Sequence, residues 1–320
     1  MKKTKRFSWL IFLLCSIVLT GCSTATGNTA ETAASTTAND VTAKFNREDL
    51  TFKSQRDTDI HATVITPEEL GNQKRPLVLF SHGFTGSREG MGTFEQMAAK
   101  LAAQGILSIM IDFPGCNDSD EPYTSYTVTN MSNDMDSAID YMIDTYEVDQ
   151  EKIGLMGHSM GGRMTALKLT DKIEAAALWA PAAAPGISGL YDFMEGKESV
   201  EKLYKTAKKD GKVLFTLWGK ENEVELSLDL FESMKASDPL KTINDYPNNL
   251  FVAVALADTA IYKTTTDAVI GAATNTKELK VISIPEANHV FTNANDEEDV
   301  TSQNFVIEQT ADFLIEHLAK

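Results

Sequence analysis

One short motif restricts the possible folds of this chain more than any other feature. Residues 157–162 read Gly-His-Ser-Met-Gly-Gly, follow a mostly apolar run at 153–156 and precede a helical pattern. A G-x-S-x-G sequence between a strand and a helix is typical of a nucleophile elbow, a tight turn that strains the serine backbone and exposes its hydroxyl. The motif therefore predicts that Ser159 is a nucleophile at the start of a helix. The alternative is an ordinary glycine-rich turn that contains a serine.

Strand and helix patterns alternate along the chain from about residue 44. Strands are predicted at 50–52, 60–65, 76–81, 106–112, 152–156, 175–180, 250–256 and 279–284, and helices at 94–103, 128–146, 161–170, 262–273 and 303–318. This alternation favours a mostly parallel sheet with helices on both faces. The pattern stops at 181–248, which predicts an insertion, interpreted as a lid over one end of the sheet. The core is expected to comprise 44–180 and 249–320.

A serine nucleophile needs a base that accepts its proton. Among the five histidines of the chain, His289 follows the last predicted strand, on a loop at the end of the sheet where Ser159 is expected. It is therefore the favoured base. His82 and His158 are rivals because they lie in the two turns that border the same site. His82 precedes Gly83 and is expected to brace its loop, whereas His158, next to the nucleophile, is expected to point elsewhere.

The base in turn needs a carboxylate that orients it. Asp258 directly follows the predicted strand 250–256 and precedes His289 by one helix and one strand. This places serine, aspartate and histidine in the chain order that accompanies a nucleophile elbow. Asp238 and Asp267 are the alternatives. They are less favourable because Asp238 falls in the insertion and Asp267 in the helix that follows Asp258.

Attack by a serine also requires N–H groups that stabilise the negative oxygen of the tetrahedral intermediate. Met160 directly follows the nucleophile and is expected to supply one of them. The second is expected from the loop 82–86, after the strand 76–81, with Phe84 as the favoured donor. The alternative is that this loop is only a strand-to-helix turn with its usual glycines.

The first 43 residues carry a targeting signal. A basic cluster, an apolar stretch at 7–19 and small residues before a cysteine have the layout of a secretory signal peptide. The sequence Leu-Thr-Gly-Cys at 19–22 resembles a bacterial lipobox, which implies that Cys22 is lipidated after removal of residues 1–21. Residues 22–43 are mostly small and polar and predict a flexible tether. The protein is expected outside the cytoplasm, bound to a membrane by its lipid; a plain signal peptide or an uncleaved anchor is the alternative.

Charge and composition exclude several other classes of protein. The formal net charge of −17 becomes −21 without the four basic residues of segment 1–21, which contains no acid. Such a surface repels phosphate backbones, so nucleic acid is not an expected partner. Three cysteines provide no disulfide framework, and the absence of dinucleotide, phosphate-loop and paired-histidine motifs predicts no cofactor and no metal. The acid-rich segment 117–121 fits no calcium loop and is interpreted as a solvated rim.

Taken together, these segments resemble α/β-hydrolases and, within that fold, bacterial feruloyl (cinnamoyl) esterases. The similar pieces are FSHGFTG at 80–86, DFPG at 112–115, GHSMGG at 157–162, WAPAA at 179–183, ADT at 257–259 and NHVF at 288–291. The resemblance implies a mostly parallel, twisted sheet flanked by helices, with an inserted lid. It also implies Ser159 as nucleophile, His289 as base and Asp258 as acid, with Phe84 and Met160 as oxyanion donors. At 255–257 the chain reads Ala-Leu-Ala, where these relatives commonly have a His-Gly pair before the acid.

The function predicted from these observations is that of a lipid-anchored, extracytoplasmic serine hydrolase. Its expected reaction is the cleavage of small carboxylic esters, such as hydroxycinnamoyl or short acyl esters, through an acyl-enzyme. A serine peptidase of the same fold is one alternative, and a ligand-binding lipoprotein that has lost catalysis is another. The oligomeric state and the acyl and alcohol specificity are left open by the sequence. Six aromatic residues of the insertion are expected either to line the substrate site or to form the insertion's own core: Tyr191, Phe193, Tyr204, Phe215, Trp218 and Phe231.

Overall fold

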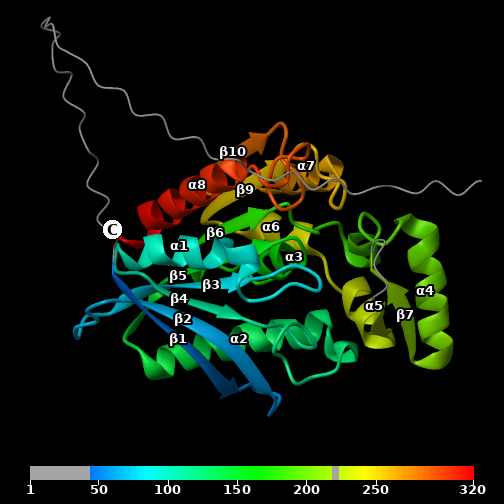
Figure 1. The fold of residues 1–320 in the computed structure, drawn as a ribbon, viewed down its shortest axis with the longest axis horizontal. Coiled ribbons are helices and arrows are strands. Elements are labelled where there is room, and N and C mark those ends of the chain that lie inside the picture. Colours follow the sequence, from blue (N-terminus) through cyan, green and yellow to red (C-terminus); the bar gives the residue numbers. More distant parts are fainter. Residues whose placement is uncertain (1–43, 218–222) are drawn as a thin grey trace, which may run out of the picture. The chain divides into compact units, whose positions relative to one another are not determined.

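The structure, a computed structural model, describes residues 44–217 and 223–320 and is built around an eight-stranded sheet (Figure 1). The strand order is β1-β2-β4-β3-β5-β6-β9-β10. The β1–β2 and β2–β4 pairings are antiparallel, and all later pairings are parallel. The strands are β1 (Phe45–Lys53), β2 (Asp59–Pro67), β3 (Arg75–Ser81), β4 (Leu107–Ile111), β5 (Val148–His158), β6 (Ile173–Trp179), β9 (Asn249–Ala255) and β10 (Glu278–Ile284).

Helices cover both faces of this sheet because its central strands are apolar on both sides. In β3, Leu77 and Leu79 pack into one hydrophobic cluster, whereas Val78 and Phe80 pack into the other. The cluster around Phe80 includes residues of α1 and α8, and the opposite cluster includes residues of α2, α3 and α7. The bounds of these helices are α1 (Thr93–Ala102), α2 (Val128–Thr145), α3 (Met160–Leu167), α7 (Lys263–Ala272) and α8 (Thr301–Leu318). The predicted α/β fold with a mostly parallel sheet is therefore confirmed.

The chain between β6 and β9, which contains the predicted insertion 181–248, folds into elements outside the main sheet (Figure 1). Two of its strands, β7 and β8, form a separate antiparallel sheet in which five residues of one strand pair with five of the other. Phe215 and Phe231 are buried in the insertion, as expected for its core. Opening and closing of this segment as a lid stays a prediction. The elements are the 3₁₀ helix η3 (Gly186–Leu190), α4 (Gly196–Asp210), β7 (Lys212–Thr216), β8 (Glu223–Ser227), α5 (Leu228–Lys235) and α6 (Pro239–Asp245).

The first two strands are longer than the sequence predicts. The apolar pattern indicates strands at 50–52 and 60–65, but β1 and β2 pair over nine residues each. Backbone pairing extends the hairpin into polar residues because an antiparallel ladder does not depend on apolar side chains.

Several predictions fall on parts of the chain that lie outside the described residues. These are the signal peptide 1–21, the lipidation site Cys22, the tether 22–43 and the insertion's Trp218. Within residues 44–217 and 223–320, no helix is both long and apolar enough to cross a membrane.

The parallel strands determine where the functional side chains meet. β3, β5, β9 and β10 run in the same direction, so the loops that follow Ser81, His158, Ala255 and Ile284 emerge at one edge of the sheet. This carboxyl edge is where ligand sites of open α/β sheets form.

Candidate active site

Ser159 occupies a strained turn between β5 and α3. Its backbone has φ 57° and ψ −118°, an unfavourable conformation for a residue with a side chain. Hydrogen bonds to the chain around β6 hold it there. The Ser159 N–H donates to Trp179 O at 2.9 Å, and Ser159 O accepts from the Ala182 N–H at 2.9 Å. The sharp turn expected from the sequence motif is therefore present.

Two glycines of the motif allow α3 to approach the sheet closely. A Cβ atom on Gly157 would lie 2.2 Å from Gly161 O, and one on Gly161 would lie 1.9 Å from Ser81 O. No side chain fits at these distances, so larger residues at either position would displace the helix. The same close packing brings the loop after β3 against the serine, because a Cβ atom on Gly83 would lie 3.1 Å from Ser159 Cβ.

His289 and Asp258 form a hydrogen-bonded pair. His289 Nδ1 lies 2.7 Å from Asp258 Oδ2. A carboxylate can only accept, so Nδ1 carries a proton, and in the neutral form of the ring the lone pair is then on Nε2. The other oxygen, Asp258 Oδ1, accepts from the N–H groups of Ala260 (2.7 Å) and Ile261 (2.9 Å). The Asp258 side chain is only 1% exposed, so both of its oxygens are held in fixed positions.

The loop that carries His289 is held by its own polar side chains. Asn288 Oδ1 accepts from the N–H groups of Val290 and Thr292, both at 3.1 Å. Gln303 of α8 donates from Nε2 to Val290 O at 2.8 Å. Since loops of this kind are mobile unless tied down, these contacts fix the position of the imidazole.

One pocket of about 670 Å³ connects these elements. Ser159, His289 and Phe84 all line it, whereas Asp258 lies behind the imidazole and Met160 is fully buried at the start of α3. The structure thus brings the sequence-predicted residues to one place, and their catalytic roles stay predictions. The lining residues are His82, Gly83, Phe84, Thr85, Gly86, Ser87, Gly90, Met91, Phe94, His158, Ser159, Asp192, Phe193, Glu195, Thr259, Ala260, His289 and Val290.

The predicted oxyanion donors lie on two sides of Ser159. Met160 is the first residue of α3, and the N–H groups of the first helical turn have no acceptor within the helix. Phe84 belongs to the loop after β3 and lines the pocket. His82 braces this loop, as expected, because its Nε2 accepts from the Phe113 N–H at 3.0 Å and its Nδ1 donates to Gly83 O at 2.8 Å. Burial lowers the pKa of His82, which keeps the ring neutral.

His158 lines the pocket instead of pointing away from it. Its Nε2 donates to His289 O at 2.8 Å, and the two rings lie 4.7 Å apart. Burial lowers the pKa of His158 to about 3, with the neighbouring His289 as a further cause. A ring that stays neutral and bonded to the His289 backbone supports the loop of the base rather than competing with it.

The two alternative acids are engaged elsewhere. Asp267 lies in α7, where both of its oxygens accept from Lys263 Nζ. Asp238 precedes α6 and accepts from the Lys241 N–H at 3.1 Å as a helix cap. Neither lines the pocket. The geometry therefore favours Asp258, despite the departure at 255–257.

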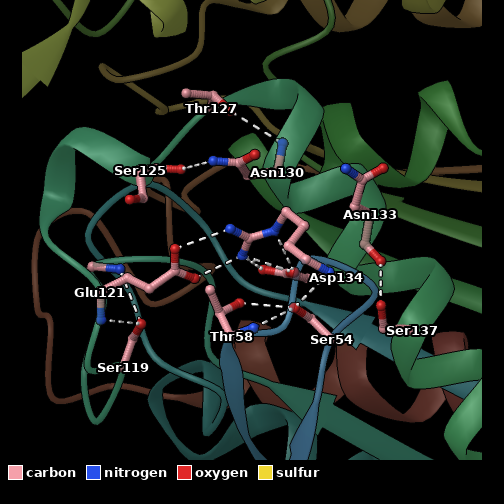
Figure 2. A network of polar contacts seen from close by, with 12 residues as sticks. Ser54, Thr58, Ser119, Glu121, Ser125, Thr127, Asn130, Asn133, Asp134 and Ser137 are labelled. Atoms are coloured by element: carbon pink, nitrogen blue, oxygen red, sulfur yellow. Dashed lines mark hydrogen bonds and ion pairs between the residues drawn. The ribbon is translucent and has the colours of Figure 1, made fainter.

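Most of the acid-rich segment 117–121 is exposed, as expected of a solvated rim, but its last residue, Glu121, is largely buried. Glu121 and Asp134, both labelled in Figure 2, contact Arg56 Nη2 at 2.6 Å and 2.9 Å. Glu121 is 14% exposed and Asp134 2%. The sequence did not indicate the burial of Glu121 because the arginine that pairs with it lies 65 residues away in sequence. No group of metal-ligating side chains occurs within the described ranges.

Two aromatic residues of the chain between β4 and α2 pack against Phe84. The rings of Tyr123 and Tyr126 lie 5.6 Å and 5.5 Å from the Phe84 ring, both edge-on. On the other side, Phe193 of the insertion lies 5.4 Å from the same ring. Aromatic contacts at these distances stabilise one arrangement of the rings. The predicted oxyanion loop is thus packed between the core and the insertion.

The sequence did not indicate which insertion residues reach the pocket, apart from the aromatic candidates. Asp192, Phe193 and Glu195 line it, and only Phe193 was among those candidates. Asp192 Oδ2 accepts from Thr265 Oγ1 at 2.6 Å, which connects the insertion to α7. No local pattern distinguishes these acids from other acids of the insertion, so no sequence signal was available to find them.

Comparison with known proteins identifies the family. Residues 72–281 match the family described as serine aminopeptidase, S33. The chain belongs to this family. Est1E from Butyrivibrio proteoclasticus, solved with ferulic acid bound, shares the α/β-hydrolase fold of this S33-family chain at a TM-score of 0.68 and 20% identity. The alignment covers 85% of this chain and 100% of Est1E.

Two further proteins are similar to the S33-family chain, one over most of its length and one over about a third of it. An esterase from Pyrococcus furiosus has a TM-score of 0.59 and 17% identity, over 86% of this chain and 92% of the esterase. An uncharacterised 31.7 kDa protein of Escherichia coli from the traX-finO intergenic region is 31% identical over 103 residues. That match covers 32% of this chain and 35% of the relative, so the chain spans about a third of the relative's length. The α/β-hydrolase fold and the resemblance to feruloyl esterases are confirmed.

Proposed function

We propose that this S33-family hydrolase cleaves carboxylic esters through an acyl-enzyme on Ser159. The observation that best supports this proposal is the 2.7 Å contact between His289 Nδ1 and Asp258 Oδ2. His289 lines the same pocket as the strained Ser159. The Ser159 hydroxyl attacks the ester carbonyl carbon while His289 Nε2 takes its proton. The proton then passes to the departing alcohol. Water attacks the acyl-enzyme with His289 again as base, which releases the acid and restores Ser159.

The oxyanion of each tetrahedral intermediate would be bound by the N–H groups of Met160 and Phe84. The position of Met160 at the start of α3 supports this role, because a helix N-terminus favours negative charge. Aspartate 258 would hold the imidazole in the required tautomer and stabilise its protonated form. These steps use side chains and backbone groups of this chain alone.

We propose small esters with an aromatic or short acyl group as the substrates. Apolar side chains of Phe84, Met91, Phe193 and Val290 contribute to the pocket wall. The volume of about 670 Å³ lies in the range that holds a small organic ligand. Est1E was solved with ferulic acid, which makes hydroxycinnamoyl esters a reasonable first class to test.

A serine peptidase is the second candidate function, because the pocket wall carries carboxylates. Asp192 and Glu195 line it, and no lysine or arginine is found among the described lining residues. Neither acid forms an ion pair within residues 44–217 and 223–320. A substrate ammonium group would be attracted to this wall and a carboxylate repelled.

One panel of substrates separates these candidates. We expect neutral acetyl and feruloyl esters to be cleaved much faster than aminoacyl amides, and succinyl hemiesters about tenfold more slowly than acetyl esters. Glu195→Gln should reduce the difference between acetyl and succinyl esters, whereas Glu198→Gln, an exposed acid of α4 outside the pocket, should not. Faster cleavage of aminoacyl amides, weakened by Glu195→Gln, would favour the peptidase. A folded protein that fails to react with a fluorophosphonate would favour a ligand-binding protein.

We also propose that Cys22 is lipidated and anchors the protein outside the cytoplasm. The lipobox-like sequence at 19–22 and the polar stretch 22–43 support this proposal. In a bacterial host, Cys22→Ala is expected to move the protein from the membrane fraction to the soluble extracytoplasmic fraction or to leave its precursor uncleaved. Cys116→Ala, which removes a buried thiol, is the matched control. Equal membrane association and equal mass of the Cys22→Ala and unmodified proteins would exclude lipidation at this position.

A further inference from the structure

Arg163 is a buried cation without an ion-pair partner. It lies in α3, four residues after Ser159, and its exposed fraction is 0%. In the described part of the chain no carboxylate forms an ion pair with it, and burial lowers its pKa to about 10. The guanidinium therefore remains charged at neutral pH. Asp238 acts on Arg163 only from a distance, as a charge that partly offsets the effect of burial. A buried charge without a direct ion pair is costly unless polar groups surround it, so its contacts need an explanation.

The guanidinium is held by acceptors from both ends of the insertion. Nη1 donates to Ala182 O at 3.0 Å and to Ala184 O at 2.7 Å. Nη2 donates to Gly186 O at 3.2 Å and to Ser237 Oγ at 2.7 Å. The first three acceptors follow β6 where the insertion begins, whereas Ser237 lies between α5 and α6, near its end. One side chain of α3, that of Arg163, thus connects both ends of the insertion.

Further contacts show that the two ends of the insertion, 182–189 and Ser237, pack closely around Arg163. We call these two ends the stem of the insertion. The Gly186 N–H donates to Ser237 O at 2.8 Å, which joins the two ends directly. A Cβ atom on Gly189 would lie only 2.3 Å from Arg163 Nη1. The chain of η3 therefore passes directly against the guanidinium.

The segment that follows this stem forms one wall of the pocket. Asp192, Phe193 and Glu195 come within nine residues of Gly186, and all three line the pocket. Phe193 also contacts the Phe84 ring at 5.4 Å. The wall is thus connected to α3 through the Arg163 contacts, in addition to its contacts with α7 and with Phe84.

We propose that Arg163 is a positioning residue that fixes the substrate-binding wall of the insertion relative to the nucleophile. This inference rests on the proposed function for its kinetic consequence. Loss of the guanidinium removes the donor of five hydrogen bonds, the four above and one to Ser237 O at 3.4 Å, and loosens the wall. Binding of substrates large enough to touch the wall should weaken, while the reactivity of Ser159 toward small reagents should persist.

The test compares Arg163→Met, Arg163→Lys and Ser237→Ala in the full-length protein, with Lys241→Met as a control that removes an exposed cation of the insertion. For a feruloyl ester, KM should rise about tenfold in Arg163→Met and less in Arg163→Lys and Ser237→Ala. KM for an acetyl ester and the rate of labelling by a small fluorophosphonate should change less than about threefold. Lys241→Met should match the unmodified protein.

Hydrogen exchange of the amides in 186–196 gives a readout that does not need activity. Exchange there should accelerate in Arg163→Met and Ser237→Ala, with little change in β5 and β9. If the unmodified protein cleaves no ester, the proposed function fails, and faster exchange would still support the positioning role. If Arg163→Met does not fold, Arg163→Lys and Ser237→Ala decide. Unchanged exchange in those variants, or an equal loss of kcat on large and small esters with unchanged KM, would overturn the inference.

Discussion

Replacement of Ser159 by alanine is expected to lower kcat for an ester substrate by about 10⁴- to 10⁶-fold, the scale observed for triad serines. The Ser159 oxygen forms the bond to the acyl group. The serine directly precedes α3, has a positive φ, is 7% exposed and lines the pocket. Turnover of p-nitrophenyl acetate and methyl ferulate measures the loss directly.

A matched serine controls for changes in the pocket itself. Ser87 also lines the pocket but lies in the loop after β3, outside the nucleophile turn. Ser87→Ala is expected to keep activity within a few-fold of the unmodified protein and to keep labelling by a fluorophosphonate. Labelling should disappear in Ser159→Ala. Near-normal turnover by Ser159→Ala, in a protein with an unchanged thermal unfolding midpoint, would rule out the acyl-enzyme mechanism.

Asp258→Asn is expected to lower kcat by about 10⁴-fold without unfolding the protein. The reason lies in how the two oxygens are used. Asp258 Oδ1 accepts from two backbone N–H groups, so the amide oxygen of asparagine would occupy that position. Its NH₂ group would then face His289 Nδ1 and force this nitrogen to accept. The proton of the imidazole would move to Nε2, which could no longer take a proton from Ser159.

The same change at Asp267 provides the control. Asp267 was an alternative acid in the sequence but pairs with Lys263 on the surface of α7. Asp267→Asn removes an exposed ion pair of small energetic value and should leave kcat within about twofold. A large loss of kcat in Asp267→Asn, together with near-normal kcat in Asp258→Asn, would show that Asp258 is not the acid of the triad.

The elbow could be predicted because its requirements are local. Gly157 and Gly161 have to be glycine, since a Cβ atom at either position would meet backbone oxygen at 1.9–2.2 Å. These requirements occupy adjacent positions in the sequence and are therefore visible as a motif. The lipobox-like sequence at 19–22 is also a local pattern, but its role as a targeting signal stays a prediction.

The pairing of His289 with Asp258 could be predicted for a different reason. Parallel strands place all of their carboxyl ends at one edge, so residues that directly follow β5, β9 and β10 converge whatever the connecting helices are. Chain order and strand ends were enough to choose Asp258 over Asp238 and Asp267. Tertiary structure then supplied the distance and the second set of hydrogen bonds that hold the carboxylate.

Sequence alone thus determined the α/β architecture, the nucleophile turn and the order of the three predicted catalytic side chains. Only the tertiary structure decided which residues of the insertion face Ser159, how Arg163 joins both ends of that insertion, and that Glu121 is buried against Arg56. The physical reason is the range of the interactions. Steric and periodic constraints act between near neighbours, whereas the buried Arg163 donates hydrogen bonds to groups up to 74 residues away, which only the folded chain brings together.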